Sequence, residues 1–226
     1  MVTFTSFFLT FIDILLHLDT HLQWVIQTYD VWTYALLFLV IFCETGLIIA
    51  PFLPGDSLLF AAGTFAALGS LDLALLFFVL FTAAVLGDFV NYSTGRYMGP
   101  RIFKKEDSFF FHKDYLLHTE QFYESHGPKT IILARFMPVI RTFAPFVAGI
   151  GKMKRTLFVF YNVLGALLWC VVFILGGYYF GLLPFVQEHF TLVLLLIIFL
   201  SFLPLFKALF SAWRSKRKEK IKNKNT

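Results

Sequence analysis

Five ionisable side chains lie within otherwise apolar stretches of this chain. Three are the acids Glu44, Asp56 and Asp88, and two are the arginines Arg135 and Arg141. A charged side chain at the centre of a lipid bilayer costs about 2.5–3.5 kcal/mol on insertion scales, so charges at membrane depth are expected to be functional. These five residues therefore form the candidate site, provided that the stretches around them lie in a membrane.

The two residue types predict two kinds of chemistry. Arginine stays protonated when buried, and its planar guanidinium matches a phosphate or carboxylate group, so Arg135 and Arg141 are candidate anion ligands. Burial disfavours the charged form of a carboxyl group, which makes Glu44 and Asp56 candidates for proton coupling. With three acids and two arginines, the cluster reaches neutrality after one protonation.

A structural role for the same residues stays open. In that interpretation, Glu44 or Asp56 forms a buried ion pair with Arg135 or Arg141 and locks the chain together. For Asp88, structural hydrogen bonding is the alternative to a role in transport.

Two further residues of the second half qualify for supporting roles. Asn162 is predicted to support the site, although both Asn162 and Trp169 also suit helix packing or a membrane interface. The histidines show no clean metal-ligand spacing, so no metal site and no cofactor are predicted.

The composition indicates an integral membrane protein. Of the 226 residues, 58% are hydrophobic, 15% are charged and 31 are Phe, and the mean hydropathy is +0.76. A soluble domain contains less apolar sequence than this. We therefore expect an all-α integral membrane protein, with its apolar side chains facing lipid.

About four transmembrane helices are expected, since a bilayer core about 30 Å thick needs roughly 20 apolar helical residues. Amphipathic interfacial helices are expected over 4–29 and, as a polar connector, over 103–128. The four apolar stretches that we assign to spans are 31–50, 71–92, 157–181 and 190–213, the last of which contains Pro204.

Two other apolar stretches are too broken to span and are predicted to be re-entrant hairpins. The first covers about 51–69 and contains Pro51, Pro54 and Gly55, and the second covers about 130–151 and contains Pro138 and Pro145. Broken backbone at membrane depth is tolerated only when it is buried in protein or lines a wet cavity. The breaks are therefore expected at the functional site.

The charge distribution predicts the topology. Seven Lys and Arg residues crowd 214–226, which favours a cytoplasmic tail beside anionic lipid over a nucleic-acid-binding segment. Working back from that tail, the two hairpins enter from opposite faces of the membrane. We expect a single membrane domain over 1–213, and homo-oligomerisation stays open.

A short internal repeat agrees with opposed hairpins. Phe60-Ala-Ala-Gly63 in the first hairpin matches Phe146-Val-Ala-Gly149 in the second, and Gly95-x-x-x-Gly99 matches Gly177-x-x-x-Gly181. Inverted repeats whose broken helices meet at the midplane are a known transporter plan. The match is short enough that coincidence is the alternative.

The ordered motifs resemble one known family. They comprise Glu44-Thr-Gly, Pro51-Phe-Leu-Pro-Gly-Asp56-Ser-Leu-Leu-Phe-Ala-Ala-Gly63, Gly87-Asp88 with Asn91-Tyr92, Arg135-Phe-Met-Pro-Val-Ile-Arg141-Thr-Phe-Ala-Pro145, and Asn162 with Gly165 and Trp169. Together they resemble the DedA family of bacterial inner-membrane proteins, in the VTT-domain superfamily. The resemblance covers about 17–181.

The resemblance implies both a fold and a function. It implies two opposed re-entrant hairpins and a transporter linked to the proton motive force, which moves undecaprenyl phosphate or phospholipid across the cytoplasmic membrane. By position, Glu44 and Asp56 match the family's essential acids, and Arg135 and Arg141 match its essential arginines. Which lipid this chain moves is not implied.

We therefore expect a multi-pass flippase of the bacterial inner membrane with a cytoplasmic C-terminus. Its partners would be a phosphate-bearing lipid, bound by the arginines, and protons, carried by the acids; no nucleic-acid partner is expected. The alternative is a proton-coupled exporter of cations or small amphipathic compounds. A membrane enzyme such as a lipid phosphatase is disfavoured, because no catalytic His or Cys accompanies Arg135 and Arg141 in the sequence.

Overall fold

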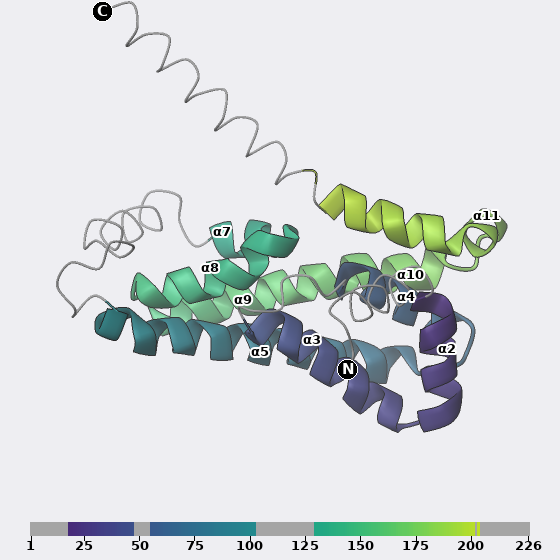
Figure 1. The fold of residues 1–226 in the computed structure, drawn as a ribbon, viewed down its shortest axis with the longest axis horizontal. Coiled ribbons are helices and arrows are strands. Elements are labelled where there is room, and N and C mark those ends of the chain that lie inside the picture. The colour runs from purple at the N-terminus through teal and green to yellow at the C-terminus, as the bar shows by residue number, and fades with distance from the viewer. Residues whose placement is uncertain (1–17, 48–54, 103–128, 202, 204–226) are drawn as a thin grey trace, which may run out of the picture.

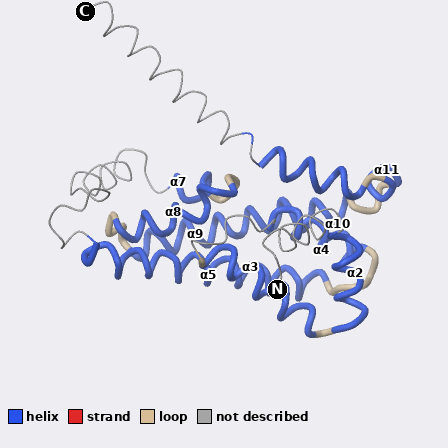
Figure 2. The backbone as a smooth tube through the Cα atoms, in the orientation of Figure 1, coloured by secondary structure: helices blue, strands red, loops and turns tan. Residues whose placement is uncertain are grey.

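The computed structural model describes residues 18–47, 55–102, 129–201 and 203. Within these ranges the regular structure is helical and contains no strand (Figure 2). This confirms the all-α prediction for the described part of the chain. The connector 103–128, the tail 214–226 and the prolines Pro51, Pro54 and Pro204 lie outside those residues.

Two long helices form the axis of the molecule. One is α5 (Leu73–Ile102), and the other combines α9 (Arg155–Cys170), the π-helical turn η1 (Val171–Leu175) and α10 (Gly176–Phe180). The two helices lie side by side and run in opposite directions (Figure 1).

Both long helices fit membrane spans by length and composition. Their apolar parts, Leu73–Gly99 and Arg155–Phe180, contain 27 and 26 residues, or about 40 Å of helix, against a bilayer core of about 30 Å. Only 33% and 39% of their most apolar stretches are buried inside the protein, which is unlike the core helix of a soluble fold. The predicted spans 71–92 and 157–181 coincide with these two helices except for residues 71, 72 and 181.

The first hairpin differs from the prediction. The expected span 31–50 is instead α3 (Trp32–Gly46), whose 15 residues extend about 22 Å, too short for the bilayer core. Leu47 leaves the helix with φ −103° and ψ 123°, and α4 (Gly55–Ala67) follows the break. α3 and α4 are therefore the two arms of one helix–break–helix hairpin, and the apolar segment 31–50 was wrongly predicted as a separate span.

The end of this hairpin that lies farthest from its break is beside the start of α5. The Tyr34 hydroxyl, near the start of α3, accepts a hydrogen bond of 2.7 Å from the backbone N–H of Asp72. α2 (Leu18–Tyr29) lies across the same end of the long helices (Figure 1), and its Trp24 and Tyr29 are exposed. Tryptophan and tyrosine are typical of membrane–water interfaces.

The second hairpin matches the predicted range of about 130–151 and begins one residue earlier. It consists of α7 (Lys129–Ala134) and α8 (Pro138–Ile150), separated by a three-residue break. Pro138 is the first residue of α8 and follows the extended Met137, a position that suits a residue without a backbone N–H. Pro145 was also predicted as a break, but this is wrong, because it lies inside α8.

The two second arms pack in equivalent ways, as the repeat predicts. In α4, a Cβ atom added at Gly63 would meet the carbonyl of Ile174, whereas in α8 one added at Gly149 would meet the carbonyl of Tyr92. Reciprocally, added Cβ atoms at Gly177 and Gly95 would meet the carbonyls of Phe60 and Phe146, the equivalent residues of the repeat. Each hairpin thus packs through glycines against the long helix of the other half.

This packing makes a testable distinction between two adjacent glycines. We expect Gly177→Ala to destabilise the protein by about 1–3 kcal/mol, because the new methyl group would overlap the Phe60 carbonyl. Gly176→Ala is the matched control, since its methyl group would meet only the Phe60 ring at 3.9 Å, and alanine favours helix. Thermal unfolding in detergent would measure both; equal melting temperatures for the two variants would contradict the packing role.

After α10 the chain forms the short helix α11 (Pro184–Glu188) and then an apolar helix over Phe190–Ser201. The latter helix lies inside the predicted span 190–213. It leads back toward the middle of the molecule, where both hairpins break (Figure 1).

Candidate functional site

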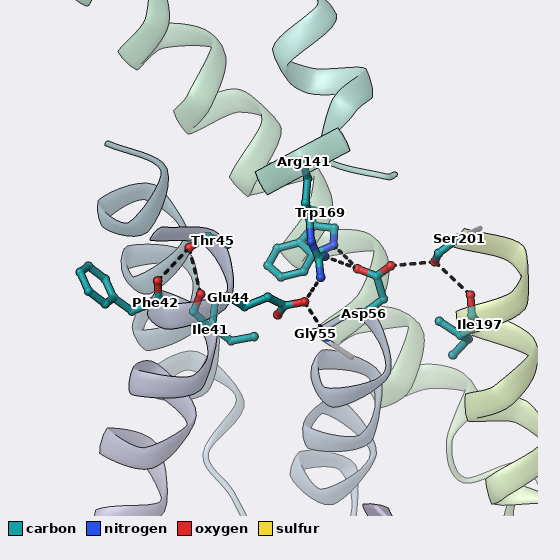
Figure 3. A network of polar contacts seen from close by, with 10 residues as sticks. All are labelled: Ile41, Phe42, Glu44, Thr45, Gly55, Asp56, Arg141, Trp169, Ile197 and Ser201. Carbon is teal, nitrogen blue, oxygen red and sulfur yellow. Dashed lines mark hydrogen bonds and ion pairs between the residues drawn. The ribbon is translucent and has the colours of Figure 1, made fainter. Parts of the chain in front are cut away.

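The breaks of the two hairpins bring three of the predicted residues into contact. Glu44 lies near the end of α3, Asp56 in the first turn of α4, and Arg141 in the first turn of α8. The Arg141 Nη1 donates to Asp56 Oδ1 at 2.7 Å, and its Nη2 pairs with Glu44 Oε1 (Figure 3). All three side chains are buried, with 0–5% of each residue exposed. One arginine from the second hairpin thus bridges two acids from the first.

Gly55 completes the contact between the arms of the first hairpin. Its backbone N–H, at the start of α4, donates to Glu44 Oε1 at 3.0 Å, which suits the unpaired N–H groups of a helix N-terminus. A Cβ atom at position 55 would overlap the Glu44 carboxylate. The predicted break residue Gly55 therefore lets α4 approach the acid.

A second ion pair lies next to the first. The Arg135 Nη2, in the break of the second hairpin, pairs with Asp88 Oδ2 in the middle of α5 and donates to Asn162 Oδ1 at 2.7 Å. Asn162 in turn donates from Nδ2 to the Val85 carbonyl at 3.0 Å. The predicted supporting residues Asp88 and Asn162 are therefore the partners of Arg135.

Trp169 connects the two ion pairs. Its Nε1–H donates to Asp56 Oδ1 at 2.8 Å, and its ring centroid lies 5.8 Å from the guanidinium carbon of Arg135 and 5.2 Å from that of Arg141. Cations at such distances from an indole ring are attracted to it. The expectation of a packing or interface role for Trp169 was incomplete, because its side chain also contacts Asp56 and both arginines.

Two neutral residues of the site, Ser201 and Asn91, were not among the predicted site residues, although Asn91 is part of the family motif. Ser201, at the end of the helix Phe190–Ser201, donates to Asp56 Oδ2 at 2.7 Å. Asn91 donates from Nδ2 to the carbonyls of Thr45 at 3.1 Å and Thr142 at 2.7 Å, and so connects α5 with both hairpins. The sequence signal that could have identified both residues is an isolated polar side chain within an apolar stretch.

The cluster carries an excess of one negative charge when every group is ionised, since it has three acids and two arginines. It also contains polar atoms with no hydrogen-bond partner among the described residues, namely Glu44 Oε2, Asn91 Oδ1, Arg135 Nη1 and Arg141 Nε. Unpaired buried donors and acceptors cost free energy, so such atoms indicate a place where a ligand can bind.

A small cavity lies against both arginines. Its lining residues are Thr45, Asp88, Ile131, Arg135, Arg141, Pro145 and Trp169. It has room for about one water molecule, with about 10 Å³ accessible to the centre of that molecule. A phosphate group would fit only if the carboxylates moved away from the guanidinium groups.

The described residues contain no group of three His, Cys, Asp or Glu side chains placed to hold a metal ion. A buried guanidinium group held by carboxylates suits an anion that replaces a carboxylate, and a buried carboxylate suits protonation.

Comparison with known proteins identifies relatives over most of the chain. The model of the VTT domain matches residues 53–179. Protein DedA of Escherichia coli K12 is 52% identical over 195 residues, which cover 85% of this chain and 89% of that protein. The inner membrane protein YghB of the same strain is 35% identical over 156 residues, covering 69% of this chain and 71% of that protein.

No solved structure matches this chain. A further relative, the inner membrane protein YqjA of E. coli K12, is 32% identical over 151 residues, covering 67% of this chain and 69% of that protein. The predicted family resemblance is thereby confirmed. This chain is a membrane protein of the DedA family, which carries the VTT domain.

Proposed function

We propose that this protein is a transporter that moves a phosphate-bearing lipid across the bacterial inner membrane and is driven by the proton gradient. The lipid class is undecaprenyl phosphate or a phospholipid. The observation that carries the proposal is the pair of buried arginines, each held by carboxylates beside a shared cavity. A phosphate crossing hydrocarbon needs compensating positive charge, and Arg135 and Arg141 supply it at membrane depth.

The ion pairs define a resting state in this mechanism. Asp88 occupies Arg135, while Glu44 and Asp56 occupy Arg141, so no guanidinium is left uncompensated. A phosphate headgroup would displace carboxylates from the arginines, and a proton would neutralise a displaced acid. Exchange of one anion for another keeps the buried charge nearly constant, which lowers the cost of loading. The lipid tail would stay in the bilayer.

The hairpins would then be re-entrant, entering from opposite faces so that their breaks meet between the two spanning helices. A single membrane domain over 1–213 with a cytoplasmic basic tail over 214–226 fits this arrangement. The names of YghB and YqjA, both called inner membrane proteins, support the inner membrane as the location.

A proton-coupled exporter of cations is the second candidate. It is favoured by the net negative charge of the fully ionised cluster, which suits a cationic substrate. In that mechanism Glu44 and Asp56 bind the substrate, and the arginines only adjust the electrostatic environment of these acids.

The double variant Arg135→Ala with Arg141→Ala separates the two candidates. A lipid flippase should lose translocation of labelled undecaprenyl phosphate or phospholipid in proteoliposomes, down to the rate of protein-free liposomes. A cation exporter should retain substrate binding in the same variant. Full lipid translocation by the double variant would refute the proposed role of the arginines.

A further inference from the structure

We propose that Asp56 Oδ2 is the atom that takes up the coupling proton, and that Ser201 is the positioning residue that makes this possible. This inference rests on the proton-linked transport proposed above. It distinguishes between the two acids that sequence reasoning left equivalent, and it assigns a role to the helix Phe190–Ser201.

The two carboxylate oxygens of Asp56 have different partners. Oδ1 accepts from Arg141 Nη1 at 2.7 Å and from Trp169 Nε1 at 2.8 Å. Guanidinium and indole groups are donors only, so Oδ1 must remain an acceptor. Oδ2 faces the Ser201 hydroxyl at 2.7 Å, and a hydroxyl can either donate or accept. A proton on Oδ2 therefore displaces neither Arg141 nor Trp169.

Ser201 also has the second acceptor that such an exchange needs. Its hydroxyl oxygen lies 2.9 Å from the Ile197 carbonyl, one turn earlier in the same helix (Figure 3). When Asp56 is ionised, the Ser201 hydroxyl donates to Oδ2. When Oδ2 carries a proton from solution, the carboxyl group donates to Ser201 Oγ, and the serine hydroxyl turns to the Ile197 carbonyl. Both protonation states are then fully hydrogen-bonded in a buried site.

Glu44 lacks such a partner. Its Oε1 accepts from the Gly55 N–H at 3.0 Å and pairs with Arg141, both of which are donors only. Its Oε2 is buried and has no hydrogen-bond partner among the described residues. A proton on Oε2 would create a buried O–H group without an acceptor, which is unfavourable. The hydrogen-bond geometry thus favours Asp56.

The surrounding charges fit this assignment. Arg141 contacts both acids, so a proton on Asp56 leaves that arginine paired with Glu44. Among the described side chains, the other charged or titratable groups on the elements packed around α4 are His21 and Tyr29 of α2, Tyr34 and Cys43 of α3, Asp88, Tyr92, Arg96 and Tyr97 of α5, and Tyr178 and Tyr179 of α10. Of these, Asp88 is paired with Arg135. Protonation of Asp56 changes the cluster from one excess negative charge to neutrality.

Infrared spectroscopy of the full-length protein in lipid bilayers tests the assignment without any substrate. Acidification should produce a carboxyl C=O band at the position of a hydrogen-bonded acid, and Asp56→Asn should abolish it while Glu44→Gln retains it. In Ser201→Ala the carboxyl O–H loses its acceptor, while the C=O oxygen Oδ1 still accepts from Arg141 and Trp169. The band should therefore move to higher frequency without reaching the position of a carboxyl group that has no hydrogen bond at all. Ser201→Thr should restore it, and Ser201→Cys, with its weakly bonding thiol, should give an intermediate position.

Ser57→Ala is the matched control. The Ser57 hydroxyl also connects α4 with the same helix, but it donates to the Leu194 carbonyl at 3.3 Å rather than to Asp56. If Ser201 only docked the helix, both alanine variants would change the band alike. The assignment is overturned if no band appears, if the band disappears in Glu44→Gln but persists in Asp56→Asn, or if Ser201→Ala leaves it unmoved.

A transport measurement separates this inference from the proposed function. In proteoliposomes containing labelled undecaprenyl phosphate, Ser201→Ala should reduce the acceleration by a proton gradient, and Ser57→Ala should retain it. If the wild-type protein moves no lipid but shows the infrared response, the proposed function fails and the proton site stands. If lipid moves and the band does not depend on Ser201, the reverse holds.

Discussion

Arg141→Ala is expected to lower the free energy of unfolding by about 3–5 kcal/mol, because removal of one partner leaves buried charge uncompensated. Arg141 is the arginine that contacts both Glu44 and Asp56. Lipid transport should fall to the background rate in the same variant. Arg141→Lys should recover only part of either property, because one ammonium group cannot reproduce a planar fork that contacts two carboxylates.

A neutral version of the cluster separates stability from transport. In the triple variant Arg141→Met, Glu44→Gln and Asp56→Asn, no buried charge is left unpaired at these positions, so we expect much of the lost stability to return. Transport should stay absent, because Arg141, one of the two anion ligands, and the acids Glu44 and Asp56 are gone. Thermal unfolding in detergent and transport in proteoliposomes would measure the two effects. Restored transport in the triple variant would show that these three charged residues have only a structural role.

Asp88→Asn should have the second largest effect on transport: we expect it to strengthen lipid binding but to slow turnover. Asparagine removes the charge that neutralises Arg135 in the resting state, while the Asn162 contact to Arg135 remains. A phosphate headgroup would then compete with one carboxylate fewer. We expect tighter binding of labelled undecaprenyl phosphate and slower turnover, since release would no longer be assisted by the returning acid.

Arg135→Ala is the comparison for that prediction. It removes the guanidinium and leaves Asp88 buried without a counter-charge, so both binding and stability should fall. Binding in detergent and turnover in proteoliposomes distinguish the two variants. Weaker lipid binding in Asp88→Asn would contradict competition between Asp88 and the headgroup for Arg135.

The five charged residues of the site could be recognised from the sequence because a charge in an apolar stretch is costly and therefore conspicuous. Their pairing could not be predicted. It depends on how the hairpin arms dock, through contacts such as the approach of Gly63 to Ile174, and hydropathy does not specify those contacts. Ser201 was missed, and the site contacts of Asn91 and of the Trp169 indole were not predicted, because neutral polar groups cost less and are less conspicuous.

The prediction of a separate span over 31–50 failed for a related reason. Both arms of the hairpin are apolar, so the hydropathy of the sequence over α3 does not show where this helix ends. The prolines at 51 and 54 predicted a break after this segment, but not the fact that α3 itself is one arm. Pro145 misled in the opposite way, since a proline is tolerated inside a membrane helix where neighbouring groups satisfy the backbone.

The most direct test of the account is the movement of labelled undecaprenyl phosphate, with phospholipids in parallel, across proteoliposomes that contain the wild-type protein, with and without a proton gradient. We predict that at least one of these lipids crosses faster than in protein-free liposomes, that the gradient accelerates it, and that Arg141→Ala abolishes the difference. Equal rates with and without protein for every phosphate-bearing lipid would contradict the account.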